Sequence, residues 1–162
     1  MDIRKAGVKD IDNIISLFKK FMRVHNKIVV QNEPRFKQYL TKKKGYVEIF
    51  RDFLIKHISS KDSLVLLAEA EGKPAGYCLC YIKDNIPIFS IERIGYLSDL
   101  YVDKRFRGKG ISTRFKDISI SWLKKKRIRH ISLCVYPQNK HAHPIYKGWG
   151  FSDFHIEMRK RI

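Results

Sequence analysis

The chain has 162 residues, 44% of them hydrophobic and 31% charged, which is typical of a globular protein, and we expect one domain over residues 1–162. Its longest apolar stretches, 64–68 and 86–89, are too short to cross a bilayer and its first ten residues are polar, so we expect a cytoplasmic protein without a membrane partner. Lysine and arginine outnumber aspartate and glutamate by 34 to 16, and the net charge of +18 can attract nucleic acid or a phosphorylated ligand.

The first sixty residues are predicted to be mainly helical. A short strand near Ile3 precedes apolar residues that recur at a spacing of 3.6 from Ile11 to Met22, which predicts an amphipathic helix. The sequence QNEP at 31–34 marks a break, and further helical segments are expected on either side of Gly45.

The middle of the chain is predicted to form strands. Residues 63–70 and 75–82 are apolar runs separated by a turn at 71–74, a pattern typical of an antiparallel hairpin near the centre of a sheet. Residues 83–90 are expected to be a loop, and residues 94–102 a further strand.

The last third alternates between helices and strands. A core-facing helix is expected from the spacing of Ile111, Phe115, Ile118 and Trp122. Residues 130–135 predict a buried strand and residues 142–147 a short helix. Apolar residues at 154, 156 and 158 alternate with polar ones, which predicts a final strand with one buried face.

The cysteines and paired histidines do not indicate a metal site. Cys78, Cys80 and Cys134 lie in apolar segments with no second cysteine pair, and we interpret all three as reduced core residues. His141 and His143 are two residues apart, so they lie on different faces of any helix, and no carboxylate accompanies them. We therefore expect no metal.

A glycine-containing loop, RFRGKGIST at residues 105–113, joins a predicted strand to a predicted helix. Gly108 and Gly110 permit backbone angles closed to other residues. The backbone amides that follow are the unpaired donors of the helix's first turn. These amides, with the positive charges of Arg107 and Lys109, predict an anion-binding site, and the anion bound at such sites is most often phosphate. A loop that needs glycine only to turn is the alternative.

Two other phosphate-binding loops are excluded by the sequence. A P-loop needs serine or threonine directly after its lysine, whereas Gly110 follows Lys109. A dinucleotide fingerprint needs a third glycine at the position of Thr113 and an opening strand–helix–strand unit, which the chain lacks.

The segments LYVDKRFRGKGISTRF at 100–115 and NKHAHPIYKGWGF at 139–151 resemble the GNAT superfamily of acetyl-CoA-dependent N-acetyltransferases. The family signature, Arg/Gln-x-x-Gly-x-Gly/Ala, fits literally from Arg105 to Gly110, or from Arg107 to Ser112 with serine in the last place. We prefer the second register, because it puts Ile111 and Phe115 on the inner face of the helix, whereas the first puts the polar Thr113 there.

The resemblance extends over the whole chain and is least specific over residues 10–60. It implies an α/β (α+β) fold of the GNAT type. In that fold a mixed, mostly antiparallel sheet of about six to seven strands is flanked by helices, and a splayed strand pair forms the acetyl-CoA cleft.

The resemblance also implies how acetyl-CoA, the cosubstrate, is held. Its pantetheine arm runs beside Leu100, Tyr101 and Val102 and is hydrogen-bonded by Asn139, although Asn139 can equally cap the helix before Ala142. Its diphosphate lies near Arg107 on the amides of Gly108, Lys109, Gly110, Ile111, Ser112 and Thr113.

The implied reaction is attack of an amine on a thioester, and two residues are candidates for proton transfer. At pH 7 an alkylamine is almost entirely protonated, and exposing its lone pair costs about 4 kcal/mol, so a base is needed. Asp99 matches a position where many relatives carry an acidic residue, and it is the candidate base, with Glu92 or a water chain as alternatives. Asp99 can instead be a solvated residue that caps the end of the strand. Tyr146 matches the family tyrosine that serves as general acid, although it can instead pack in the core. Because proline suits only the first helical turn, Pro144 predicts that the helix carrying Tyr146 starts late.

The resemblance thus implies an N-acetyltransferase that acts on a primary amine of a small molecule or a protein in a ternary complex, with a homodimer as a possible assembly. The acceptor pocket is expected from residues 10–60 and 83–90. A basic nucleic-acid or ribosome-associated module, using 42–44 and 124–129, and an acetyl-CoA sensor without turnover are the alternatives. Because the glycine loop, Asn139 and Tyr146 occur together, we favour the enzyme.

Overall fold

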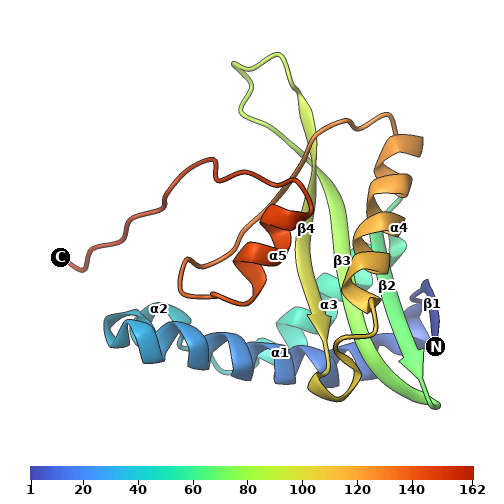
Figure 1. Cartoon of the computed structure of the whole chain (residues 1–162), viewed down its shortest axis with the longest axis horizontal. Coiled ribbons are helices and arrows are strands. Elements are labelled where there is room, and N and C mark those ends of the chain that lie inside the picture. The colour runs from blue at the N-terminus through green and yellow to red at the C-terminus, as the bar shows by residue number, and fades with distance from the viewer.

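A computed structural model describes residues 1–162 as a five-stranded mixed sheet with helices on both faces (Figure 1). The strand order is β1-β2-β3-β4-β5, and every neighbouring pair is antiparallel except β4 and β5, which are parallel. The mixed, mostly antiparallel sheet confirms the expected fold class, although it has five strands where six or seven were expected.

The elements follow the predicted order. The strands are β1 (Asp2–Lys5), β2 (Ser63–Ala70), β3 (Lys73–Asp84), β4 (Arg93–Val102) and β5 (Ile131–Leu133). The helices are α1 (Ile11–Asn32), α2 (Lys37–Leu40), α3 (Tyr46–Ser59), α4 (Ile111–Lys125) and α5 (Ala142–Gly148), with short 3-10 turns η1 (Val8–Asp10), η2 (Pro34–Phe36) and η3 (Lys104–Phe106). None of the helices is both long enough and apolar enough to cross a membrane.

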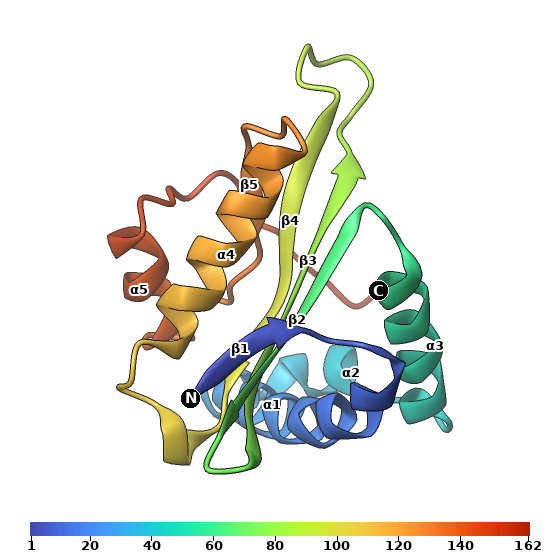
Figure 2. The same cartoon turned by 90° about the vertical axis from the view of Figure 1, so that its right-hand side faces the viewer.

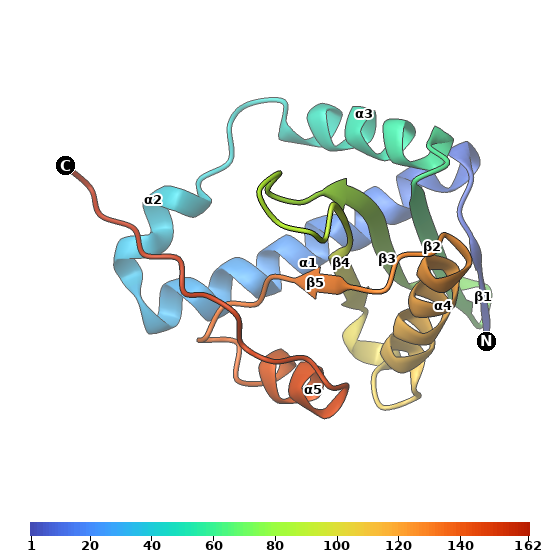
Figure 3. The ribbon, with the colours of Figure 1, turned by 90° about the horizontal axis from the view of Figure 1, so that it is seen from above.

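Helices lie on both faces of the sheet (Figure 3), and each face carries a separate apolar core. Helices α1 and α3 cover one face, where Ile14, Leu54 and Leu79 are fully buried. Helix α4 covers the other, where Phe115 belongs to a core that also includes Leu66 of β2 and Leu97 of β4. Cys78 and Cys80 lie in this second core as expected.

Strand β4 contains a bulge that decides which way its side chains point. Leu97 pairs with Cys80, but the next paired residue of β4 is Asp99, opposite Leu79, so Ser98 is an extra residue. Residues two apart on a regular strand share a face. Because of the bulge, Leu97 instead packs toward α4, while Asp99 follows Leu79 toward α1 and α3.

The C-terminal third departs from the sequence predictions in four places. The strand expected at 130–135 is paired only at Ile131–Leu133, and Cys134 is exposed rather than buried. Helix α5 begins before Pro144, so the proline occupies the first turn, where its missing amide costs nothing. The expected strand at 154–158 is not formed, and its apolar side chains are exposed.

The side view in Figure 2 shows the connection between β3 and β4 projecting beyond the helices. Strand β3 reaches Asp84, so the loop expected at 83–90 begins after it. Ile86 and Ile88 in this loop are exposed.

Candidate functional site

The glycine loop connects the end of β4 to the start of α4. Gly108 and Gly110 have φ angles of 75° and 74°, in the left-handed region that favours glycine. A Cβ atom added at either position would meet nothing within 4 Å, so both face open space. The first hydrogen bond of α4 runs from the amide of Arg114 to the carbonyl of Gly110, and the amides of residues 108–113 donate to no atom of the chain. These amides are therefore free to bind an anion.

Buried Asp103 anchors the start of this loop. Its carboxylate accepts hydrogen bonds from the amide of Arg105 at 3.1 Å and from Lys20 Nζ of α1 at 2.6 Å. Burial alone would raise the pKa of Asp103, but the hydrogen bonds from Arg105 and Lys20 outweigh it and hold the pKa well below its ordinary value. The carboxylate therefore stays charged and ties the loop to α1.

The orientation of α4 favours the register from Arg107 to Ser112. Ile111 and Phe115 are buried against the sheet, whereas Thr113 is exposed. Arg107 is exposed and donates from Nε to the carbonyl of Val102 at 3.1 Å, which holds its guanidinium beside the end of β4. Lys109 is also exposed in the loop.

Strands β4 and β5 separate next to this loop. They pair only from Gly95 to Leu97 on β4, while β4 continues to Val102. Residues 98–102, which include Leu100, Tyr101 and Val102, therefore have no strand partner on that edge. This is the splayed strand pair that the resemblance implied, and its open edge can hydrogen-bond an extended ligand.

Asn139 lies in the segment that leads from β5 into α5. Its Oδ1 accepts a hydrogen bond from the amide of Ala142 at 3.1 Å, so its helix-capping role is present. Its Nδ2 donates to no atom of the chain and remains available. The preceding residue, Gln138, has a buried Oε1 without any hydrogen-bond partner, and a ligand N–H group would satisfy it.

Asp99 is half-buried on the face of the sheet that α1 and α3 cover. Burial raises the pKa of this carboxyl group to about 6, although Tyr77 opposes the shift by donating from its hydroxyl to Oδ2 at 3.2 Å. For Tyr81 and Tyr96, burial raises the pKa of the hydroxyl, and the charge of Asp99 adds to the effect. Asp99 is thus a carboxylate among tyrosines with enough proton affinity to act as a base near neutral pH.

Tyr146 lies on α5, on the side of the sheet that α4 covers (Figure 3). Lys116 Nζ of α4 lies 5.7 Å from the ring of Trp149, next to α5, and the Tyr146 ring packs 5.5 Å from the same tryptophan. Burial raises the pKa of the Tyr146 hydroxyl, with a smaller effect of Cys78. The hydroxyl therefore keeps its proton at neutral pH.

Asp99 lies on the face of the sheet that α1 and α3 cover, whereas α5, which carries Tyr146, lies on the side of α4 (Figure 3). Glu92 is exposed in the loop before β4, seven residues from Asp99, or about 23 Å along an extended strand. Asp99 and the free edge of β4 lead directly into the glycine loop along the chain, Asn139 and Tyr146 come from the segment after β5, and Glu92 lies before β4 begins.

Sequence reasoning missed three contributors to this region. Tyr77 supplies the hydrogen bond to Asp99, and Gln138 supplies the unsatisfied oxygen. His25 of α1 packs edge-on against Tyr136, with ring centroids 4.8 Å apart, and desolvation lowers its pKa. No sequence pattern marks His25 or Tyr77, because each reaches the site only through tertiary packing, whereas Gln138 is adjacent to Asn139 in sequence.

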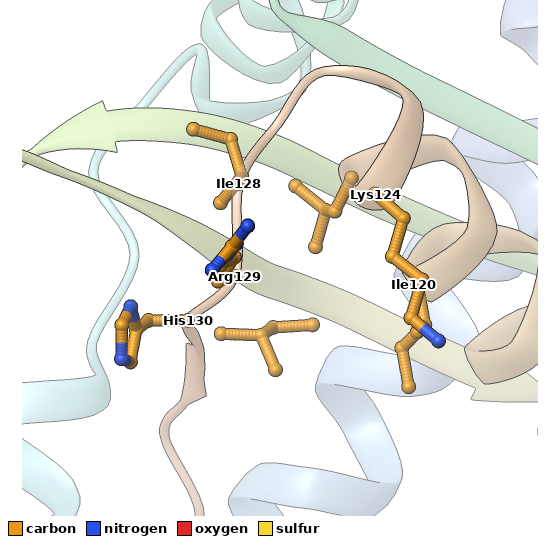
Figure 4. Close-up of a pocket in the computed structure, with 7 residues that line it drawn as sticks. Ile120, Lys124, Ile128, Arg129 and His130 are labelled. Atoms are coloured by element: carbon orange, nitrogen blue, oxygen red, sulfur yellow. The ribbon is translucent and has the colours of Figure 1, made fainter.

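Two cavities lie at the other end of α4. One of about 270 Å³ is lined by apolar residues that include Ile120 and Ile128 and by Lys124, Arg129 and His130 (Figure 4). Because α4 rises about 1.5 Å per residue, this cavity is about 20 Å from the glycine loop. It is separate from the opening between β4 and β5.

Comparisons with known proteins agree with this geometry. Residues 27–151 match the family model described as the acetyltransferase (GNAT) family. An uncharacterized N-acetyltransferase of Methanocaldococcus jannaschii is 30% identical over 99% of this chain, and the chain spans 66% of that relative's length.

Two solved structures share the fold. A tetramutant of the BH1408 protein of Bacillus halodurans has a TM-score of 0.80 at 22% identity, with 100% of both chains covered. A predicted acetyltransferase with acetyl-CoA from Clostridium acetobutylicum has a TM-score of 0.78 at 20% identity, covering 99% of this chain and 95% of that one. The family match over most of the chain, together with the free amides at α4 and the parted strands beside them, shows that this protein belongs to the GNAT acetyltransferase family.

Proposed function

We propose that the protein is an enzyme that transfers the acetyl group of acetyl-CoA to a primary amine of a small molecule or a protein, by direct attack in a ternary complex. The observation that carries this proposal is the row of free amides at residues 108–113, which opens beside the unpaired edge of β4. Membership of the GNAT family and a fold shared with an acetyltransferase described with acetyl-CoA support it.

Acetyl-CoA fits this region by its chemistry. Its diphosphate is an anion, and hydrogen bonds to a charged group contribute roughly 1.5–3 kcal/mol each. Its pantetheine arm carries amides that can pair with the edge of β4 at Leu100–Val102 and with Asn139 Nδ2, and a ligand N–H would also satisfy Gln138 Oε1. Arg107 and Lys109 add positive charge beside the phosphate amides.

The reaction forms a C–N bond and breaks the thioester C–S bond. In our proposal Asp99 accepts, directly or through water, the proton that the attacking amine must lose. Tyr146 donates a proton to the departing thiolate sulfur from the other face of the sheet. A carboxyl group with a pKa of about 6 is a better proton acceptor near pH 7 than one of ordinary pKa, and a buried phenol keeps its proton until a strong base appears.

The acceptor amine would approach from the side of α1 and α3. Tyr81, Tyr96 and the His25–Tyr136 pair lie on that side of the sheet, near Asp99 or the end of β5. These aromatic groups favour an amine with an apolar or flat substituent, because ring faces attract both apolar surface and ammonium groups. The net charge of +18 disfavours polycationic acceptors.

A free-thiol assay tests the proposed function. Purified protein is incubated with acetyl-CoA and a panel of small amines, polyamines and peptides, and CoA thiol release is measured with and without each amine. We expect amine-dependent release with at least one acceptor. Binding of acetyl-CoA without amine-dependent release from any acceptor would contradict turnover and indicate a sensor.

The variant Tyr146→Phe tests the acid role within the same assay. Loss of a general acid lowers kcat by about 100-fold or more and leaves the affinity for acetyl-CoA nearly unchanged. An unchanged kcat in Tyr146→Phe would remove this residue from the mechanism.

A further inference from the structure

The connection between β3 and β4 presents apolar side chains to solvent at one end of the molecule. Ile86, Ile88, Phe89 and Ile91 have exposed fractions of 58%, 82%, 52% and 37%. All four belong to the loop that projects beyond the helices (Figure 2). A contiguous group of exposed apolar side chains typically marks an interaction site.

Hydrogen bonds within this loop give it a defined shape. Asn85 closes its base, because the amide of Asn85 donates to the carbonyl of Glu92 at 2.7 Å and its Nδ2 donates to the carbonyl of Ile91 at 2.9 Å. Farther out, the amide of Phe89 donates to the carbonyl of Ile86 at 3.0 Å, which forms a turn. The apolar side chains are therefore held on an ordered projection, so little conformational entropy is lost when they bind a partner.

A cluster of basic residues lies behind the apolar loop. The end of α4 and its connection to β5 contain five lysines and arginines, and no acidic residue, at 124–129. This segment is adjacent to the loop, because residues 90–93 and 127–130 line a common cavity of about 310 Å³. In both Figure 1 and Figure 2 the loop extends farther out than the α4–β5 connection. Apolar side chains therefore lie outermost, with positive charge set back from them.

Most of these cations have no carboxylate to neutralise them. Asp62 pairs with Arg93 at 2.6 Å and lies 4.0 Å from Lys126. The other four basic residues of 124–129 form no ion pair. One of them, Arg127, has a φ angle of 61°, in the left-handed region where glycine would be less strained. The chain thus keeps an exposed cation at this position despite its strain.

We propose that this end of the protein docks on an anionic phospholipid surface. Ile86, Ile88 and Phe89 insert at the boundary between headgroups and acyl chains, and the basic residues at 124–129 lie against the lipid phosphates. Proteins bind the surface of a bilayer through this combination of buried apolar area and attraction to anionic lipids.

Three other partners fit this surface less well. RNA would use the cations and leave the apolar side chains exposed to water. A protein partner needs a groove that matches the projecting loop, whereas lipid adapts to its shape. A second copy of the chain would bring two charges of +18 together.

The proposed contact is peripheral and remote from the acetyl-CoA region. The expectation that the protein has no membrane partner came from its short apolar stretches, and docking on a surface needs no spanning segment. The loop precedes β4, whereas the glycine loop follows it, about 30 Å away along the strand. The proposal is therefore independent of the proposed catalytic function.

Co-sedimentation with vesicles tests the docking surface. The vesicles contain phosphatidylcholine alone or equal amounts of phosphatidylcholine and phosphatidylglycerol, at about 0.15 M salt to screen adsorption by net charge. We expect binding only to vesicles with phosphatidylglycerol. Converting Ile86, Ile88 and Phe89 together to serine should raise the lipid concentration for half-maximal binding about 10-fold or more. Val8→Ser with Ile49→Ser, at exposed apolar positions elsewhere, is the matched control and should bind like the wild type.

Arg127→Gly with Arg129→Ser tests the electrostatic contribution. Glycine adopts a φ angle of 61° without strain and both arginines are exposed, so Tm should not fall. The variant should weaken binding to the anionic vesicles about 10-fold or more. Lys43→Ser with Lys44→Ser removes the same charge from the α2–α3 connection, remote from the loop (Figure 2), and should change binding less than about twofold.

A fluorescent probe reports whether the loop itself meets the lipid. Because Cys78 and Cys80 are buried, Ser90→Cys in a Cys134→Ser background has a single accessible thiol. An environment-sensitive dye attached at Ser90→Cys should shift its emission to shorter wavelength when anionic vesicles are added. The same dye at Thr41→Cys, an exposed position in the α2–α3 connection, is the control and should not respond.

Three results would overturn the proposal. A protein that binds single-stranded RNA, or nothing, but no phosphatidylglycerol vesicles does not use this surface for lipid. Vesicle binding that is unchanged in the triple serine variant shows adsorption by net charge alone. A dye at Ser90→Cys that does not respond while the protein is bound shows that another face meets the membrane.

Discussion

Asp99 derives its proposed role from two opposing local effects. Burial destabilises its charged form, and the hydrogen bond from Tyr77 at 3.2 Å stabilises it, with burial the larger effect. The result is a carboxyl group with a pKa of about 6 among tyrosines. A carboxylate fully solvated at a strand end, the alternative interpretation of the sequence, would titrate nearer its ordinary value of 3.8.

We predict that Asp99→Asn removes the acidic limb of the pH–rate profile. In the wild type kcat/KM should rise with pH through about 6, because only the ionised carboxylate accepts a proton. In Asp99→Asn it should fall at least 100-fold. Asp117→Asn, which changes an exposed carboxylate on α4, is the control and should leave the profile intact.

The same variant should not lose stability at pH 7. A carboxyl whose pKa is raised by folding contributes stability while it is protonated, below its ordinary pKa, and loses that contribution as pH rises through about 6. Asparagine carries no charge and can still accept from Tyr77, so Tm at pH 7 should be equal or higher. An unchanged rate profile, or a large drop in Tm, would contradict this account of Asp99.

At the scale of elements, sequence patterns located most of the fold and only part of the site. Helix α4 was predicted because its apolar residues recur at helical spacing toward one core. The hairpin of β2 and β3 was predicted because both strands are buried on both faces and therefore read as apolar runs. The bulge at Ser98 was not predictable, since nothing in SDLYV distinguishes a bulged strand from a regular one. Without that bulge Asp99 would face α4, and the base and acid candidates would lie on the same face of the sheet.

The errors near the C-terminus have a common physical cause. Alternation at 154–158 predicts a strand, but a strand also needs a neighbour, and the sequence does not say whether the same chain provides one. The expected burial of Cys134 failed because β5 ends one residue before it. Both errors follow from pairing, which periodicity alone does not encode.

A comparison of two glycines tests how tightly the elements around the site are packed. A Cβ at Gly76 on β3 would lie 2.5 Å from the backbone carbonyl oxygen of Tyr101, which cannot move without displacing β4. A Cβ at Gly95 would lie 2.5 Å from Cδ1 of Leu123, a side chain that can shift. We predict that Gly76→Ala lowers the free energy of unfolding by about 2–3 kcal/mol, as measured by urea denaturation. The loss in Gly95→Ala should be about 1 kcal/mol smaller than the loss in Gly76→Ala. A larger loss for Gly95→Ala would contradict the description of these contacts.

At the scale of the whole molecule, basic residues outnumber acidic ones by 34 to 16, and the buried carboxylates of Asp10 and Asp103 form ion pairs with basic side chains of other elements. Asp10 is buried at the start of α1 and accepts hydrogen bonds from both terminal nitrogens of Arg4, each at 2.8 Å, and from the amide of Gly7 at 2.8 Å. The Arg4 hydrogen bonds outweigh burial and lower the pKa of Asp10 to about 2. This contact joins β1 to α1, as Asp103 joins the glycine loop to α1.

We predict that Asp10→Asn makes the protein less stable in a pH-dependent way. A carboxyl whose pKa is lowered by folding stabilises the protein above its ordinary pKa of 3.8, and the contribution is lost as pH falls toward about 2. The variant should therefore lose about 2 kcal/mol at pH 7, and the difference from wild type should shrink between about pH 4 and 2. Asp12→Asn, at an exposed ion pair with Arg51, should cost less than about 0.5 kcal/mol. Equal losses for the two variants would show that the buried pair has no special role.

The most direct measurement of the central claim is calorimetric titration of acetyl-CoA into Gly110→Asp and Gly72→Asp. Both glycines have left-handed φ angles, 74° and 67°, and both face open space, so the backbone strain of the two substitutions is matched. Gly72 lies in the β2–β3 turn, whereas Gly110 opens α4, where a carboxylate would repel a phosphate and block the free amides. We predict at least 100-fold weaker binding for Gly110→Asp and less than a twofold change for Gly72→Asp. Undiminished affinity in Gly110→Asp would contradict the claim that the amides at the start of α4 bind the diphosphate of acetyl-CoA.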